Sequence, residues 1–222
     1  MVYYTRKMKK NNSKMPYHKR EKTKNELILK QKQGVNNCHS KNIINQKGNH
    51  LIVDSLFERS RKTLVRDGIQ NKKIITIDNC AQIQDDLHHK TNFKEYAKKT
   101  RLKFNSAFID IIQTPTKVLR EVKPFFERKR LTNNSSVAIT TCPRGITKQK
   151  FSRFDLELKK MAQRNNYQLI PMTVPNSIRL KVKSISSYNI QSHMSDNAST
   201  GKTGRTITLF YKCIYNLPHP KK

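Results

Sequence analysis

The sequence lacks several residues and patterns that would place it in a common class of protein. It has no tryptophan and only six glycines among its 222 residues. Its four cysteines form no C-x-x-C pair, so neither a disulfide framework nor a zinc ribbon is indicated, and reduced, mostly buried thiols are expected. No apolar run approaches the length of a membrane span, and the N-terminus has no apolar signal region, so neither a span nor a secretory signal is expected.

Acidic residues are scarce and basic residues are abundant. The chain has 46 Lys+Arg against 15 Asp+Glu, which gives a formal net charge of +31. Self-repulsion of this size opposes a compact fold unless a polyanion neutralises it, and nucleic acid is the polyanion that fits best. The hydrophobic fraction of 35% is low for a globular chain. One modest core with long polar extensions is therefore expected. The sequence contains no basic helix with a broad apolar face, so membrane binding is not expected.

Composition divides the chain into four parts. Residues 1–50 contain only two acids and almost no periodic apolar face, so they are predicted to form a basic RNA-binding arm that is disordered unless bound. Residues 51–113 are predicted as a helical basic segment, residues 114–216 as an α+β core domain, and residues 217–222 as a tail. In the basic segment we expect helices over 51–68 and 92–112, separated by a short strand over 74–77.

The expected core begins with a helix at Thr114-Pro115, because threonine can cap a helix and proline suits its first position. Pro124 should kink or end that helix. A strand over 137–142, a second helix over 151–165 and a strand over 167–174 follow. Period-two alternation then predicts a strand over 178–183, with its cations on one face, and a last strand over 206–215 with one face formed by Ile207, Leu209, Tyr211, Cys213 and Tyr215.

No pattern in the sequence indicates catalysis. There is no G-x-S-x-G or H-E-x-x-H motif, and the only paired carboxylates are Asp85 and Asp86. Together with His88 and His89 these could bind a divalent cation, although neighbouring residues seldom converge on one ion, so a surface loop is the other interpretation. Residues 201–203 resemble the end of a phosphate-binding loop but lack its first glycine. We therefore expect no enzyme, no cofactor and no metal.

Two sets of short motifs resemble ribosomal proteins of the small subunit. Val122-Lys123-Pro124 with Glu127 and Lys129, followed by a strand over 137–141 and a helix from Lys148, resembles the seventh protein of the bacterial and organellar series. Residues 96–103, Pro143-Arg144-Gly145, Lys150-Phe151 and Ile170-Pro171 are similar to the fourteenth, although Cys142 replaces that family's arginine and its zinc-binding cysteines are absent. The first match departs from its family after Asn165. Either resemblance implies that Arg144, Lys148, Lys150 and Arg153 contact ribosomal RNA.

The sequence alone thus predicts a structural constituent of a ribosome, in a mitochondrial small subunit, with a cytoplasmic location as the alternative. Its expected partners are ribosomal RNA and neighbouring ribosomal proteins, with no membrane and no small-molecule substrate. The rival hypothesis is a viral or plasmid-type protein that binds or replicates DNA or RNA. The predicted fold class is α+β, with helices packed on a short, mainly antiparallel sheet in one small mixed core with long basic extensions. The residues predicted to bind RNA are Arg6, Lys7, Lys9, Lys10, Lys19, Arg20, Arg59, Arg61, Lys62, Arg66, Lys98, Lys99, Arg101, Arg144, Lys148, Lys150, Arg153, Arg179, Lys181 and Lys183.

Overall fold

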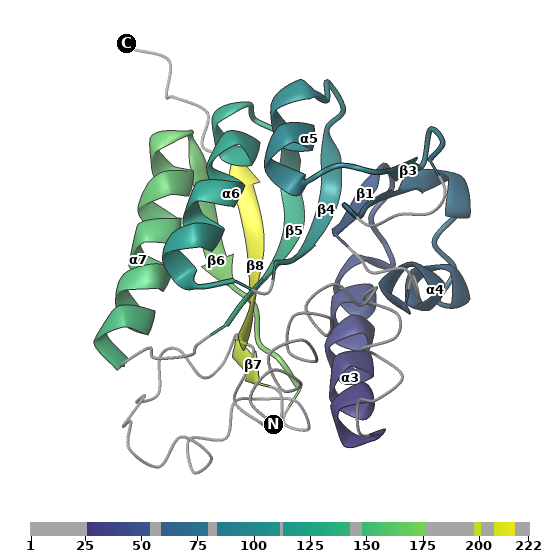
Figure 1. Ribbon diagram of the computed structural model, residues 1–222, viewed down its shortest axis with the longest axis horizontal. Helices are drawn as coiled ribbons and strands as arrows, with labels where there is room; N and C mark the ends of the chain where they lie inside the picture. Colours follow the sequence, from purple (N-terminus) through teal and green to yellow (C-terminus); the bar gives the residue numbers. More distant parts are fainter. Residues whose placement is uncertain are drawn as a thin grey trace, which may run out of the picture.

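The computed structural model describes residues 26–53, 59–79, 84–111, 113–142, 148–175, 198–200 and 207–215, and one eight-stranded sheet lies at its centre (Figure 1). The order of the strands across this sheet is β3-β2-β1-β4-β5-β8-β6, with β7 paired to β8 outside that path. The strands are β1 (His50–Val53), β2 (Ile74–Ile77), β3 (His88–His89), β4 (Phe104–Asp110), β5 (Leu131–Thr141), β6 (Tyr167–Pro171), β7 (Ala198–Thr200) and β8 (Ile207–Tyr215).

The sheet is mostly parallel. Every neighbouring pair among β3, β2, β1, β4 and β5 is parallel. β8 is antiparallel to β5, β6 and β7, so among the described strands it alone runs against the others. The predicted small, mainly antiparallel sheet is therefore wrong. Its error has a simple cause: β8 alternates most clearly in the sequence, whereas short buried runs carry no mark of their direction.

Helices cover both faces of the sheet, which makes a three-layer, doubly wound arrangement (Figure 1). One face packs against α5, α6 and α7, and the other against α3 and α4. The first five strand positions follow the order 3-2-1-4-5 of a nucleotide-binding doubly wound sheet. The helices are α3 (Glu26–Ile43), α4 (Arg59–Arg66), α5 (Phe93–Lys99), α6 (Pro115–Glu127) and α7 (Lys148–Arg164), and a 3-10 turn spans Asn71–Lys73.

The apolar core consists of two clusters, one on each face of the sheet. Neighbouring residues of a strand belong to different clusters because successive side chains point to opposite faces. Leu51 of β1 lies in the larger cluster with the side chains of α5, α6 and α7, whereas its neighbour Ile52 lies in the smaller cluster with those of α3 and α4. In β4, Ala107 and Phe108 divide in the same way. One sheet joins strands from the ranges 51–113 and 114–216.

Burial on both faces explains the two helices that were wrongly predicted. The range 51–68 holds strand β1 and only then helix α4, and the range 92–112 holds helix α5 and then strand β4. A strand with two buried faces is a continuous apolar run, so its spacing also satisfies a helical template. The predicted stop at Gly68 is confirmed, since this residue has a φ of 98°.

Several elements were predicted well. Helices α6 and α7 and strands β2 and β8 lie where the apolar spacing placed them. Pro124 stays inside α6, which continues to Glu127, and Thr114 precedes the helix without a side-chain capping bond. The predicted strand over 178–183 and the first 25 residues of the predicted arm lie outside the described residues.

A buried polar contact fixes α7 to the sheet. The hydroxyl of Tyr211, which is fully buried on β8, donates to Asp155 Oδ1, and Lys159 Nζ donates to Asp155 Oδ2 over 2.7 Å. A carboxylate that is 15% exposed needs such donors, because an unsatisfied charge is costly in a protein interior.

Replacing Tyr211 with phenylalanine should therefore lower the free energy of unfolding by about 1.5–3 kcal/mol, the usual cost of losing a hydrogen bond to a charged group. Urea unfolding measures this value. In an Asp155→Asn background the same substitution should cost clearly less, because the charged acceptor has gone. An equal cost in both backgrounds would show that the contact with Asp155 contributes nothing.

Candidate ligand site at the carboxyl edge of the sheet

The order of the strands reverses between β1 and β4, at the carboxyl ends of the parallel strands. Strands β2 and β3 lie on one side of β1, and β4, the next strand in the sequence, lies on the other side. Ligands of doubly wound sheets bind outside the carboxyl ends of the strands at such a switch point. The residues that follow β1, β2 and β4 are therefore the first candidates for a ligand site.

Two carboxylates flank β1 at this edge. Val53, the last residue of β1, is paired with Ile77 on one side and with Ile109 on the other. Asp78 follows Ile77, and Asp110 follows Ile109, so the two acids stand at the same height, about 10 Å apart across β1. Both are partly buried. In a chain with 15 acids and 46 bases, this places negative charge at the switch point.

The backbone holds both acids firmly. The amide of Asp78 donates to the carbonyl of His89 at the end of β3, over 3.2 Å. Asp110 is the last residue of β4 and is paired with Thr140 of β5. Sequence reasoning missed both residues, although each directly follows a short apolar run, which is a signal that could have found them.

The connection after β4 is also tied down. The carbonyl of Gln113 accepts the backbone amide of Cys142 over 2.8 Å and the hydroxyl of Thr141 over 2.9 Å. These two bonds join the start of α6 to the end of β5. The edge beside Asp110 is therefore built from backbone with fixed partners, which suits a preformed binding site.

The sequence that follows β1 lacks the glycines of a dinucleotide site. The five residues after β1 are Asp54, Ser55, Leu56, Phe57 and Glu58, and none is glycine. Dinucleotide sites use glycines at this turn so that the backbone can approach the pyrophosphate. Without them, and with carboxylates on both sides of β1, the edge disfavours a phosphorylated ligand and favours one that carries positive charge.

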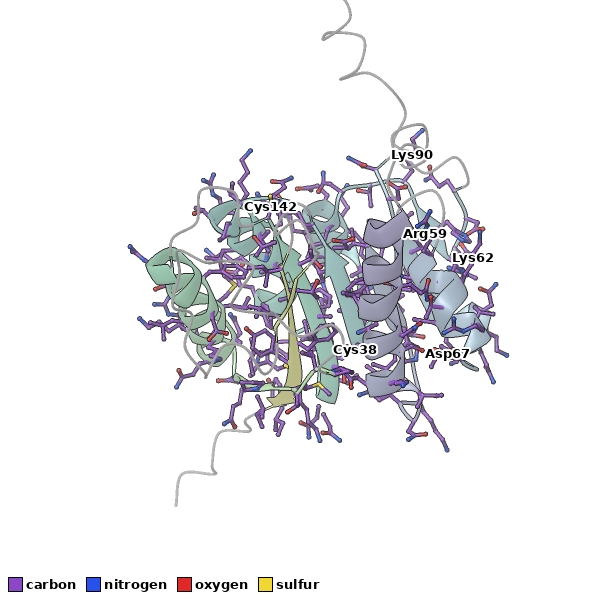
Figure 2. The ribbon with its side chains drawn as sticks, turned by 90° about the horizontal axis from the view of Figure 1, so that it is seen from below. Cys38, Arg59, Lys62, Asp67, Lys90 and Cys142 are labelled. Carbon is purple, nitrogen blue, oxygen red and sulfur yellow. The ribbon has the colours of Figure 1, made fainter. Side chains whose placement is uncertain are left out.

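The predicted RNA-binding residues of α4 fall into two groups. Lys62 and Arg66 are exposed, and Lys62 lies on the outer side of α4 (Figure 2). Arg59 begins the helix and is partly buried. Arg61 corrects the prediction, because it is only 3% exposed and its guanidinium donates to Ile74 and Thr76 of β2. It joins α4 to the sheet and is not available to a polynucleotide.

The other predicted residues are placed in part. Lys98, Lys99 and Arg101 are exposed at the end of α5 and just after it, and Arg153 is exposed on α7. Residues 148 and 150 lie in the first turn of α7, whose side chains are not described. The predicted residues outside the described part of the chain are Arg6, Lys7, Lys9, Lys10, Lys19, Arg20, Arg144, Arg179, Lys181 and Lys183.

The acidic and histidine cluster before β3 forms a turn. Asp85 Oδ1 accepts the amides of Leu87 and His88 over 2.7 Å each, and it lies 2.8 Å from Nδ1 of the same histidine. His89 packs its ring against Tyr96. Within the described residues, no group of three or more His, Cys, Asp or Glu could hold a metal ion.

The described cysteines are free thiols. Cys38 and Cys213 are buried, as predicted, whereas Cys142 is partly exposed. Cys38 and Cys142 lie well apart (Figure 2). Burial raises the pKa of Cys38 to about 11, so that thiol stays protonated. Of the helices that the structure describes, none combines the length and the apolar character that crossing a bilayer requires.

Comparisons with known proteins found similarities only among solved structures. No protein-family model matches the sequence, and no curated protein matches it. The N-methyltransferase NodS from Bradyrhizobium japonicum WM9, solved with S-adenosylhomocysteine, is 9% identical, with a TM-score of 0.44 over 83% of this chain and 85% of that one. The plantazolicin methyltransferase BpumL, solved with a monoazolic desmethylPZN analogue and S-adenosylhomocysteine, is 10% identical, with a TM-score of 0.48 over 86% of each chain.

These findings overturn the ribosomal interpretation. The doubly wound, mostly parallel sheet is not the small core that the ribosomal resemblance implied. The expectations of a non-enzymatic ribosomal constituent, of ribosomal partners without a small-molecule ligand, and of a viral replication protein are wrong. The mitochondrial location stays a prediction. At these low identities and TM-scores no activity can be transferred, so function has to come from the residues of this chain.

Proposed function

We propose that this chain is a methyltransferase that binds S-adenosylmethionine at the carboxyl edge of β1, β2 and β4. The observation that carries the proposal is the pair Asp78 and Asp110, which stand at the same height on either side of β1 at the switch point. The solved methyltransferases described above agree with the proposal, but it does not rest on them.

The residues of this edge fit an adenosyl sulfonium better than a dinucleotide. In doubly wound sheets, an acid about 20 residues beyond the first strand binds the hydroxyls of the ribose, and Asp78 at the end of β2 occupies that position. Asp110 adds a second negative charge near the same point. S-adenosylmethionine has a ribose and a cationic sulphur but no phosphate, which matches two carboxylates and a turn without glycine.

S-adenosylmethionine supplies a methyl group on a positively charged sulphur, which a nucleophilic atom of the substrate can accept. The chain holds and orients this donor. Asp78 binds the ribose hydroxyls, while the charge of Asp110 favours the cationic donor over uncharged competitors. The bonds from Thr141 and Cys142 to Gln113 keep the connection after β4 in place beside it.

Replacing Asp78 with alanine should weaken binding of S-adenosylhomocysteine, the demethylated product, by about 10- to 100-fold, because one or two hydrogen bonds to a charged group are lost. Equilibrium dialysis of the purified chain measures this change. Glu127→Gln is the matched control: it removes one exposed acid at the far end of α6 and should leave the affinity unchanged.

Circular dichroism would verify that both variants remain folded. Equal affinity of the Asp78→Ala variant and the wild-type chain would contradict the assignment of Asp78 to the ribose.

A further inference from the structure

The edge of the sheet opposite the candidate ligand site is strongly basic. It lies uppermost in Figure 1, where β8 ends and β4 and β5 begin. The loops here connect the ends of α5 and α6 to β4 and β5, and a further loop precedes β1. We define the basic rim as the cations of these loops and of the last turn of α5: Lys47, Lys98, Lys99, Arg101, Lys103, Arg128, Lys129 and Arg130.

Hydrogen bonds from backbone and side chains bring these loops together. Phe104 pairs with Leu131, and its amide donates to the carbonyl of Arg130 over 2.8 Å, so the loops before β4 and β5 run side by side. Arg130 Nε donates to the carbonyl of Ala97 in α5 over 3.3 Å. The loop before β1 joins them, since Asn49 Nδ2 lies 3.5 Å from the carbonyl of Lys103.

Acidic side chains do not neutralise the rim. Glu95 pairs with Lys98 over 3.0 Å, and Glu127 pairs with Lys123 of α6 over 3.5 Å. Among the described residues, the other cations of the rim form no ion pair. Except for Arg130, which is partly buried, all of them are exposed.

The dipole of helix α5 explains only part of this charge. Lys98 and Lys99 occupy the last turn of α5, where cations complement the helix dipole. Arg101, Lys103 and Lys129 lie beyond the helices and gain nothing from that effect. Their field acts on a neighbour: the pKa of Tyr215 is lowered, first by a hydrogen bond with Lys129 and also by the charges of Lys129 and Lys103.

We propose that the basic rim binds a single-stranded nucleic acid through its phosphates. The described rim consists of loops and helix C-termini, so it offers no helix or β-ribbon that could enter the major groove of duplex DNA and read its bases. Long, exposed cations on neighbouring loops suit an unpaired strand whose phosphates can contact them in turn. This inference rests on the rim alone and does not depend on the proposed cofactor.

The test compares two triple variants of the full chain by fluorescence anisotropy with a labelled single-stranded RNA. The rim variant carries Arg101→Gln, Lys103→Gln and Arg128→Gln. The control carries Lys117→Gln, Arg120→Gln and Lys123→Gln, which removes equal charge from exposed positions on α6. Each lost phosphate contact should reduce the salt slope of the affinity by about 0.7, so the rim variant should lose about two from its slope and bind at least tenfold more weakly at moderate salt.

Other outcomes would overturn the proposal. A rim variant with wild-type affinity and slope, or with no larger change than the α6 control, would place RNA binding elsewhere, for instance in the lysine-rich residues 1–25. Tighter binding of a duplex DNA of equal length would overturn the preference for a single strand. Titration with S-adenosylhomocysteine should give wild-type affinity in the rim variant, so that failure here is distinct from failure of the cofactor site.

Discussion

Replacing Arg61 with alanine is expected to lower the free energy of unfolding by about 3–5 kcal/mol, because several buried hydrogen-bond acceptors lose their donor. The guanidinium of Arg61 donates to the carbonyl of Ile74 and the hydroxyl of Thr76, each over 2.9 Å, and also to the side chain and carbonyl of Asn71. Alanine would leave several of these buried acceptors without a donor, each at a cost of about 1–3 kcal/mol.

Urea unfolding of the variant measures this cost. Lys62→Ala, which changes the next residue of α4 on its exposed side, is the control and should shift the free energy by less than about 0.5 kcal/mol. Arg61→Lys should recover only part of the loss, because an ammonium group cannot reproduce the planar set of donors. A loss no greater than that of Lys62→Ala would mean that the bonds from Arg61 to β2 do not hold α4.

Mild acid is expected to remove about 4 kcal/mol of stability through two buried histidines. His39 of α3 stacks on Phe108, and His50 begins β1 with its Nδ1 2.8 Å from the hydroxyl of Ser106. Burial lowers the pKa of His39 to about 3, with a contribution from the charge of His50, and burial lowers the pKa of His50 to about 4. As the pH falls, the unfolded chain therefore binds protons on these histidines that the folded chain does not bind.

The sign and the window follow from these values. Both folded pKa values lie below the unfolded value near 6.5, so the contribution to stability is complete above that pH and is lost as the pH falls below it. At about pH 5 each histidine lowers the free energy of unfolding by roughly 2 kcal/mol relative to neutral pH. Acids with lowered pKa, such as Asp67 and Asp85, act in the same direction only at still lower pH.

Urea unfolding at neutral pH and at about pH 5 measures the loss, and His39→Gln should reduce it by about half because one titrating group has gone. Equal loss in the variant and the wild-type chain would contradict the burial of a neutral His39. His39 Nε2 has no hydrogen-bond partner within the described residues, so the variant need not break a polar contact there.

Residue spacing predicted helices α6 and α7 and strands β2 and β8, and failed at β1 and β4, whose apolar runs also fit a helical period. Val118, Val122 and Phe125 follow a helical period on α6, and β8 alternates between Leu209, Tyr211 and their neighbours, so both elements could be predicted. In β1 and β4 the apolar residues face two different clusters, so the run lacks the period-two alternation of a half-buried strand. Strand direction then depends on contacts between distant segments, which no local pattern contains.

The candidate site was hidden for a related reason. Asp78 and Asp110 are 32 positions apart in the sequence, and only the placement of β1 between β2 and β4 brings them to one edge. The surplus of cations, in contrast, was visible in the composition. The position of these cations could not be predicted, because the loops that carry Arg101 and Arg128 lie side by side only when β4 pairs with β5.

Calorimetric titration of the purified full chain with S-adenosylhomocysteine, beside parallel titrations with a nicotinamide dinucleotide, tests the central claim most directly. Asp78 at the end of β2 and the glycine-free sequence after β1 predict saturable binding of one S-adenosylhomocysteine per chain, and no binding of the dinucleotide. A folded chain that gives no heat with S-adenosylhomocysteine, or that prefers the dinucleotide, would contradict the assignment of this edge to an adenosyl ligand without phosphate.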